Sequence, residues 1–270
     1  MTWDAAGVTR TISAAKASGM DFIELALLDP ASTDTALGRD LLEKAELPAV
    51  FSFGLPQETW ASHNPSGTAD FLKLAIEKAA GLGSEALSGV TYGGIGERSS
   101  FPTTEQELDN VEAALEATVM YAKDHGPAIG IEPVNHYETH LINTTTQVVE
   151  MIERVCAPNM FLHLDTYYMN IEETGMGNGI ITGRAHLNNL LLSESDRGTS
   201  GQGPCDWDEI FATLAAINFK GGLAMESYIN MPPEIGYGHS IWRPVAESAE
   251  AVIGQGLPFL RGKAQQYGLI

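Results

Sequence analysis

The sequence predicts an α/β fold of the (β/α)8 barrel type, the TIM barrel, with a site at the carboxyl ends of its strands. Three short apolar runs each end in a carboxylate, at Glu132, Asp165 and Glu226. Segments with helical spacing of apolar residues separate these runs along the chain. Strands that alternate with helices form a parallel sheet, and polar residues at their carboxyl ends meet at one face of a barrel.

The first half of the chain follows this alternation except at its beginning. Residues 4–18 have apolar side chains at helical spacing, followed by Gly19 as a helix end. Because only Met1, Thr2 and Trp3 precede this helix, the first strand of the barrel is predicted to be missing, truncated or replaced by another element. The strands expected next are 21–27, 48–54 and 86–90, and the helices are 35–45, 68–80 and 104–124.

The second half continues the pattern, and we expect residues 1–270 to form a single domain. We expect a loop at 166–173, and the segment 175–183 is too glycine-rich for a sound helix. Pro244 suits the first position of a helix, where no backbone donor is needed. The remaining expected elements are strands ending at 132, 165, 192 and 226, and helices 145–155, 206–216, 244–253 and 259–266.

Composition restricts the class of partner. The 35 acidic and 15 basic residues give a net charge of −20, which repels nucleic acid and anionic membrane surfaces. The sequence contains no apolar run of the roughly 18 residues that a membrane span requires. Cys156 and Cys205 are too few for a disulfide framework or a cysteine zinc site. We therefore expect a cytoplasmic protein that binds neither nucleic acid nor membranes.

Three carboxylates at nearby strand ends repel one another unless a positive charge lies between them. Oxygen ligands at this density favour a hard divalent ion such as Mg²⁺ or Mn²⁺. Such an ion can polarise a carbonyl and a hydroxyl while a carboxylate takes the proton from the carbon between them. The alternative is that each acid caps a helix or pairs with an arginine.

Four segments of the chain carry polar residues at or after the expected strand ends. They are IEPVNHYETH (131–140), LDTYYMNIEE (164–173), SESDRGTSG (193–201) and AMES (224–227). In this order they resemble the signature segments of the ketose 3-epimerases, which include the D-tagatose and D-psicose (allulose) 3-epimerases of the xylose-isomerase-like barrels. The resemblance runs from about residue 21 to the carboxyl terminus. It implies a divalent metal, with Mn²⁺ first and Co²⁺ or Mg²⁺ as alternatives, a small ketose substrate, and a homodimer or homotetramer.

The resemblance also assigns roles to individual residues. Glu132 and Glu226 match the catalytic pair that binds metal and exchanges the C3 proton on opposite faces of an enediolate. Asp165 matches a further metal ligand. Glu138 and Arg197 match residues that bind the substrate.

Two positions depart from the family pattern. The family places a fourth metal ligand, a histidine, six residues before the arginine, and this position is Leu191 here. A substrate-binding histidine three residues after the aspartate corresponds to Tyr168, which can still donate a hydrogen bond. His163 lies two residues before Asp165 and on the same side of its strand, so it is either a support for the metal or a core histidine.

The sequence thus predicts a metal-dependent epimerase that inverts C3 of a free ketose. Aldose–ketose and hydroxypyruvate isomerases use the same enediolate chemistry on related barrels, and they stay as alternatives within enzymes. Another class of answer is a degenerate barrel that binds sugar without turnover. Leu191, Tyr168 and the missing strand favour that class, whereas the retained cluster of charges disfavours it.

Overall fold

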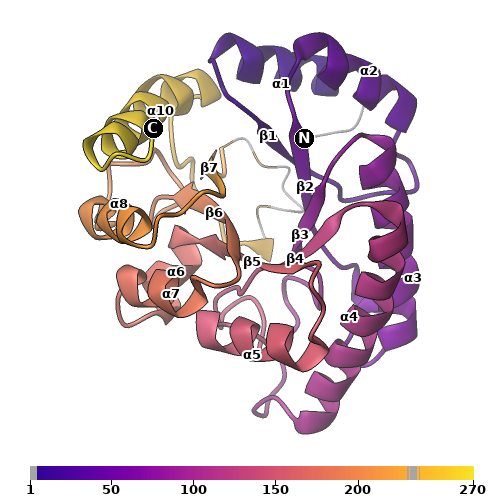
Figure 1. The fold of residues 1–270 in the computed structure, drawn as a ribbon. Helices are drawn as coiled ribbons and strands as arrows, with labels where there is room; N and C mark the ends of the chain where they lie inside the picture. Colours follow the sequence, from indigo (N-terminus) through magenta and orange to yellow (C-terminus); the bar gives the residue numbers. More distant parts are fainter. Residues whose placement is uncertain (1–4, 230, 232–235, 237) are drawn as a thin grey trace. The chain divides into compact units, whose positions relative to one another are not determined.

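The computed structural model describes residues 5–229, 231, 236 and 238–270 (Figure 1). The chain divides into two compact units. The first comprises Met1–Gly94, Thr103–Ile131 and Ile152–Phe161, and the second comprises Ile95–Pro102, Glu132–Met151 and Leu162–Ile270. A single domain over the whole chain stays a prediction.

The first unit begins, within its described residues, with a helix. Residues 1–4, where the prediction about a first strand falls, lie outside the described residues. The strands β1 to β4 are neighbours in sequence order and parallel to one another. The elements of this unit are α1 (Ala5–Ala17), β1 (Ile23–Ala26), α2 (Thr35–Ala45), β2 (Ala49–Gly54), η1 (Gln57–Thr59), α3 (Pro65–Gly81), β3 (Ala86–Val90), α4 (Glu105–His125) and β4 (Ala128–Ile131).

Local sequence signals determine where the helices of this unit begin. Thr104 forms a capping box with Glu107 at the start of α4, as its Thr-x-x-Glu spacing predicts. Asn64 caps α3 by accepting from the backbone N–H of Gly67 at 3.0 Å, so the helix starts at Pro65, earlier than expected. Helices α3 and α4 pack side by side (Figure 1). Residues of β3 are buried throughout, which is typical of a parallel strand covered on both faces.

The second unit contains the parallel strands β5, β6 and β7, again neighbours in sequence order. Helix α5 and strand β5 begin in one unit and end in the other. All residues of β5 are buried, whereas those of β7 are half-buried. The elements are α5 (Thr145–Val155), β5 (Met160–Asp165), α6 (Thr166–Glu172), α7 (Met176–Gly183), β6 (Leu187–Ser193), α8 (Trp207–Ala216), β7 (Gly222–Glu226) and α10 (Ala249–Gln266).

Two predictions for residues 166–183 are wrong. The expected loop is helix α6, because the side chain of Asp165 accepts from the backbone N–H of Tyr167 and caps the first turn. The glycine-rich segment forms helix α7, where a Cβ at Gly177 would meet Glu209 and Thr213 of α8 at 2.8 Å. The glycines allow α7 to pack closely against α8, and this packing offsets their low helix propensity.

The prediction for the carboxyl-terminal helices is also wrong. The structure has one helix, α10, in place of two, and Pro244 lies before it. Ser248 sets its start by accepting from the backbone N–H of Ala251 at 3.1 Å. Pro258 lies inside α10, although the sequence reading separates two helices there. Within the described residues, no helix is both long enough and apolar enough to cross a membrane.

Candidate active site

The three strand-end carboxylates predicted from the sequence all belong to the second unit. Asp165 is the last residue of β5, Glu226 is the last residue of β7, and Glu132 directly follows β4. Asp165 is fully buried and Glu132 is 7% exposed. The side chain of Glu226 is 29% exposed, so this carboxylate has the readiest access to solvent of the three.

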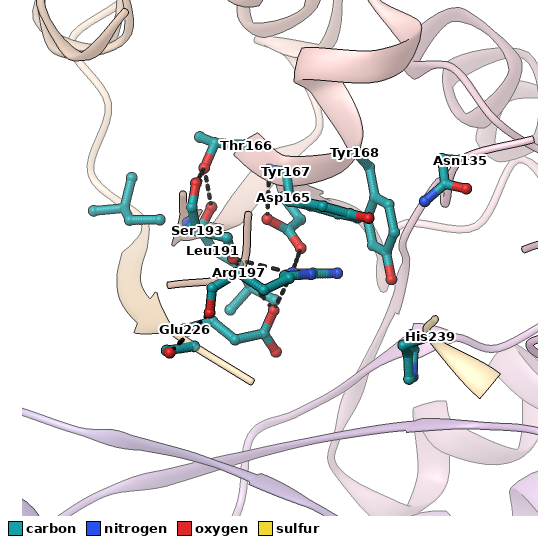
Figure 2. A network of polar contacts seen from close by, with 12 residues as sticks. Asn135, Asp165, Thr166, Tyr167, Tyr168, Leu191, Ser193, Arg197, Glu226 and His239 are labelled. Atoms are coloured by element: carbon teal, nitrogen blue, oxygen red, sulfur yellow. Dashed lines mark hydrogen bonds and ion pairs between the residues drawn. The ribbon is translucent and has the colours of Figure 1, made fainter. Parts of the chain in front are cut away.

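Arg197 lies between two of these carboxylates (Figure 2). Its Nη1 donates to Asp165 Oδ2 and to Glu226 Oε2, both at 2.5 Å. The same nitrogen lies 3.1 Å from Ser193 Oγ, which in turn donates to Glu226 at 3.3 Å. We call Asp165, Ser193, Arg197 and Glu226 the guanidinium cluster.

Three aromatic rings surround this guanidinium. The Arg197 Cζ lies 3.9 Å from the ring centroid of Tyr167, 4.7 Å from that of Tyr168 and 4.2 Å from that of Tyr228. Such contacts stabilise a desolvated cation through the negative ring faces. Burial opposes the charge of Arg197, but Asp165 and other negative groups nearby outweigh burial and raise its pKa well above its ordinary value. The guanidinium therefore stays charged.

Opposite edges of the Arg197 guanidinium differ in their contacts. Nη1 satisfies two carboxylates, whereas the buried Nε and Nη2 have no hydrogen-bond partner among the described residues. A buried donor without a partner costs roughly 1–3 kcal/mol, more when it is charged, so it requires an explanation. Binding of a ligand with oxygen acceptors would satisfy both nitrogens.

A second group of polar side chains lies around Glu138. Tyr168 Oη donates to Glu138 Oε2 at 2.9 Å, and Asn135 Nδ2 donates to Glu138 Oε1 at 3.1 Å. His239 Nδ1 approaches Glu138 Oε1 at 3.5 Å. We call Asn135, Glu138, Tyr168 and His239 the Glu138 cluster. Tyr168 connects the two clusters, because its ring contacts Arg197 and its hydroxyl donates to Glu138.

Burial and neighbouring charges change the pKa values in the Glu138 cluster. Burial raises the pKa of Glu138, but His239, Arg197 and the Tyr168 hydroxyl outweigh it and hold this pKa below its ordinary value. Burial, with added repulsion from Glu138 and Glu132, raises the pKa of Tyr168 well above its ordinary value. The Tyr168 hydroxyl therefore stays protonated and able to donate.

Strand register determines what faces the guanidinium cluster. Asp165 of β5 pairs with Leu191 of β6, and Ser193 of β6 pairs with Glu226 of β7. Because side chains alternate along a strand, Leu191 shares the face of Ser193, whose hydroxyl contacts Arg197. Leu191 therefore places an apolar side chain beside Asp165. His163, two residues before Asp165 on β5, is fully buried and pairs with Asn189 of β6. Its role toward a metal stays a prediction.

A divalent ion requires several oxygen or nitrogen ligands that converge on one point. Asp165 Oδ2 and Glu226 Oε2 do converge, but on Nη1 of Arg197. In the part of the chain that the structure describes, no group of three or more His, Cys, Asp and Glu side chains is arranged to hold a metal ion. As they stand, the residues do not fit the metal that the family resemblance implies. The metal role of Glu132, Asp165 and Glu226 stays a prediction.

For two of the three acids, the structure instead matches the alternative reading of the sequence. Asp165 caps helix α6 through Oδ1 and pairs with Arg197 through Oδ2, and Glu226 pairs with the same arginine. Sequence reasoning missed Tyr167, Ser193, Tyr228 and His239 as neighbours of the site. Ser193 could have been found, since it ends strand β6 as Asp165 ends β5. No spacing signal connects His239 to Glu138.

Comparison with known proteins defines the class of fold. The family described as "Xylose isomerase-like TIM barrel" matches residues 12–261. The crystal structure of D-allulose 3-epimerase from Methylomonas sp. has 34% sequence identity and a TM-score of 0.93, over 97% of this chain and 93% of that chain. The α/β TIM barrel predicted from the sequence is thereby confirmed.

Curated relatives narrow this class further. L-ribulose 3-epimerase from Methylomonas sp. (strain DH-1) is 36% identical over 96% of this chain and 92% of its own length. Ketose 3-epimerase from Arthrobacter globiformis is 31% identical over 97% of this chain and 92% of its own length. The chain belongs to the ketose 3-epimerase family of the xylose isomerase-like TIM barrels, as the four signature segments indicated.

Proposed function

We propose that this protein inverts the configuration at C3 of a free ketose by proton transfer through a cis-enediolate. Glu132 and Glu226 are the catalytic pair. One carboxylate takes the C3 proton, the electron pair forms the C2=C3 bond, and the other group, as a carboxylic acid, returns a proton to the opposite face. Each turnover exchanges the protonation states of the two residues. No redox partner is needed, because the substrate gains and loses no electrons.

The observation that carries this proposal is the unpaired edge of Arg197 beside Glu226. Nε–H and Nη2–H of an arginine form a rigid fork that suits two neighbouring oxygens, as a ketose carbonyl and its adjacent hydroxyl present. Glu226 is paired with the opposite edge of the same guanidinium. A ketose bound to the fork would bring its C3–H close to a catalytic carboxylate.

Charge at the site favours an uncharged sugar. Asp165 and Glu226 pair with Arg197, Glu138 interacts with the same guanidinium, and Glu132 acts on the neighbouring Tyr168. A phosphorylated sugar would add negative charge to this surplus. Glu138 and Tyr168 bind substrate hydroxyls in this proposal, and Glu138 is suited to accept from them. The related D-allulose 3-epimerase from Methylomonas sp., crystallised in complex with D-allulose, supports a ketose of this size.

The cofactor and the assembly are separate from the proton transfer proposed above. The resemblance predicts a divalent metal, Mn²⁺ first, and a homodimer or homotetramer. Mn²⁺ could gather Glu132, Asp165 and Glu226 only if Arg197 withdrew from the two carboxylates that it now joins. The proton transfer described above uses side chains of this chain alone. Light scattering on the purified protein tests the assembly.

The test of function is deuterium uptake from D₂O into D-fructose, D-psicose, D-tagatose and L-ribulose, followed by NMR with and without added Mn²⁺. Epimerisation places deuterium at C3 and yields the C3 epimer. Aldose–ketose isomerisation would instead place deuterium at C1 of the recovered ketose and at C2 of an aldose product. A protein that binds sugar without turnover would incorporate none, and that result would refute the proposed function.

Two variants test the catalytic pair. Glu132→Gln and Glu226→Gln keep the side-chain shape but cannot exchange a proton, so each should lower epimerisation by about 10²-fold or more. Glu150→Gln, which changes an exposed glutamate of α5, is the matched control and should retain full activity. If either catalytic variant epimerises like the control, the assignment of that residue is wrong.

A further inference from the structure

The position of the Arg197 guanidinium suggests a role beyond substrate binding. We propose that Arg197 is the resident cation of this site, and that it supplies to the enediolate oxygens the positive charge that a divalent ion would otherwise supply. This inference rests on the proposed function for its chemistry. The identity of the cation between Asp165 and Glu226 can be tested separately, because it does not depend on turnover of a ketose.

The first argument is that Arg197 already makes the contacts that such an ion requires. One atom, Nη1, lies 2.5 Å from an oxygen of Asp165 and 2.5 Å from an oxygen of Glu226. Asp165 is fully buried and Arg197 is 1% exposed, so water screens this charge poorly. An ion and Nη1 cannot hold the same two oxygens together.

The second argument is that the backbone holds Arg197 in this position. Its φ of 62° lies in the left-handed region, which a residue other than glycine adopts only when its surroundings impose it. Its N–H donates to the Glu194 carbonyl at 2.9 Å, and its own carbonyl accepts from Tyr228 N at 3.0 Å and Ser227 Oγ at 2.8 Å. The loop is therefore built to direct this side chain inward.

The third argument concerns Leu191. It pairs in register with Asp165 and shares the strand face of Ser193, yet its side chain has no atom that can bind a metal. A divalent ion at this site would keep fewer ligands and an apolar neighbour. A guanidinium stacked on Tyr167, Tyr168 and Tyr228 needs no ligand from Leu191. Leu191 therefore disfavours a divalent ion at this site but does not disfavour the guanidinium of Arg197.

The free edge of Arg197 provides the chemistry. As the C3–H bond breaks and C2=C3 forms, negative charge develops on O2, with O3 beside it on the same side of a cis-enediolate. Nε–H and Nη2–H, which have no partner among the described residues, can donate to these two oxygens. When the second proton reaches C3, the C2 carbonyl forms again and the donors release the product. Protons balance, and no electrons leave the substrate.

The first experiment uses the unmodified protein. After dialysis against a chelator, we expect C3 deuterium uptake to persist at a rate within about twofold of that with Mn²⁺, and Mn²⁺ titration followed by electron paramagnetic resonance to show no stoichiometric binding. Uptake that disappears on chelation and returns with Mn²⁺ overturns the inference while the proposed function stands. One bound Mn²⁺ per chain, lost in Asp165→Asn, overturns it whether or not any ketose turns over. If no ketose takes up deuterium and no Mn²⁺ binds, the proposed function fails and the role of Arg197 toward the enediolate fails with it, whereas its place as the cation between Asp165 and Glu226 stands.

The second experiment changes the cation. Arg197→Gln should lower uptake by about 10²- to 10³-fold, as removal of a donor to a developing oxyanion does. Arg197→Ala leaves space for an added guanidinium salt, which should partly restore uptake. Arg184→Gln, at an exposed arginine after α7, is the matched control. Retained activity in Arg197→Gln would overturn the inference.

The third experiment provides a readout that is independent of catalysis. Leu191→His combined with Arg197→Met supplies a nitrogen ligand and frees the two carboxylates, so this double variant should bind Mn²⁺ and show a rise in melting temperature with Mn²⁺ concentration. Leu191→His alone should bind Mn²⁺ much more weakly, since Arg197 still holds Asp165 and Glu226. Equal Mn²⁺ binding by the single and double variants would show that Arg197 does not occupy the position of the ion.

Discussion

The guanidinium cluster and the Glu138 cluster both hold buried carboxylates, but they neutralise them differently. Asp165 and Glu226 share a permanent cation, one nitrogen of which lies 2.5 Å from each. Glu138 depends on the neutral donors Tyr168 and Asn135, with His239 at 3.5 Å. The first cluster therefore balances its carboxylates with a fixed positive charge, whereas the second relies mainly on hydrogen bonds from uncharged groups. The two clusters can be separated by mutation because they share no carboxylate.

The largest effect is expected for Asp165→Ala. The change leaves a buried guanidinium with one carboxylate and removes the cap of helix α6, so it should lower the free energy of unfolding by about 3–5 kcal/mol. Denaturant unfolding followed by circular dichroism measures the loss. Asp208→Ala is the matched control, since Asp208 forms an ion pair with Lys263 at the surface and its loss should cost far less. Equal losses for the two variants would show that burial of the Asp165–Arg197 ion pair does not change its contribution to the free energy of unfolding.

A smaller effect is expected for Glu138→Gln. The change removes the charged acceptor for Tyr168 and should lower the free energy of unfolding by about 1–3 kcal/mol at neutral pH. The folded pKa of Glu138 lies below its ordinary value of 4.5, despite burial, because of His239, Arg197 and Tyr168. Its contribution to stability is therefore fully present above this ordinary value and is lost as the pH falls through the folded value.

Denaturant unfolding at a series of pH values tests this sign. The wild type should lose stability more steeply than Glu138→Gln as the pH falls below 4.5. Glu150→Gln, at an exposed glutamate of α5, is the control and should follow the wild type more closely. Parallel curves for the wild type and Glu138→Gln would mean that Glu138 does not have a lowered pKa.

The smallest effect is expected for Tyr168→Phe. The ring stays over Arg197 and only the 2.9 Å hydrogen bond to Glu138 is lost, so the free energy of unfolding should fall by about 1–2 kcal/mol. Tyr267→Phe removes an exposed bond of 2.7 Å to Asp208 and should cost less. Because Tyr168 is assigned to substrate hydroxyls, Tyr168→Phe should also raise KM for the ketose. A loss no greater than that of Tyr267→Phe would show that the buried hydrogen bond from Tyr168 to Glu138 contributes no more to stability than an exposed one.

The sequence predicted the site well where strands end and poorly where side chains meet across the fold. The carboxyl-terminal limits of β5 and β7, at Asp165 and Glu226, agree with the prediction because a run of apolar residues followed by an acid is a local signal. Helix α7 escaped prediction because its glycines serve a contact with α8, which propensity alone does not contain. His239 escaped prediction because it is a hundred and one residues from Glu138, the carboxylate that it approaches.

By itself, the sequence determined the alternation of strands and helices, the carboxylates at the strand ends, and the family through four short segments. Periodicity and capping act between residues a few positions apart, so a single chain displays them directly. Only the tertiary structure decided that Arg197, 32 residues from Asp165 and 29 from Glu226, joins these two carboxylates. The physical reason is that the direction of a long side chain depends on the turn that carries it, here a left-handed residue, and on the rings that pack around it.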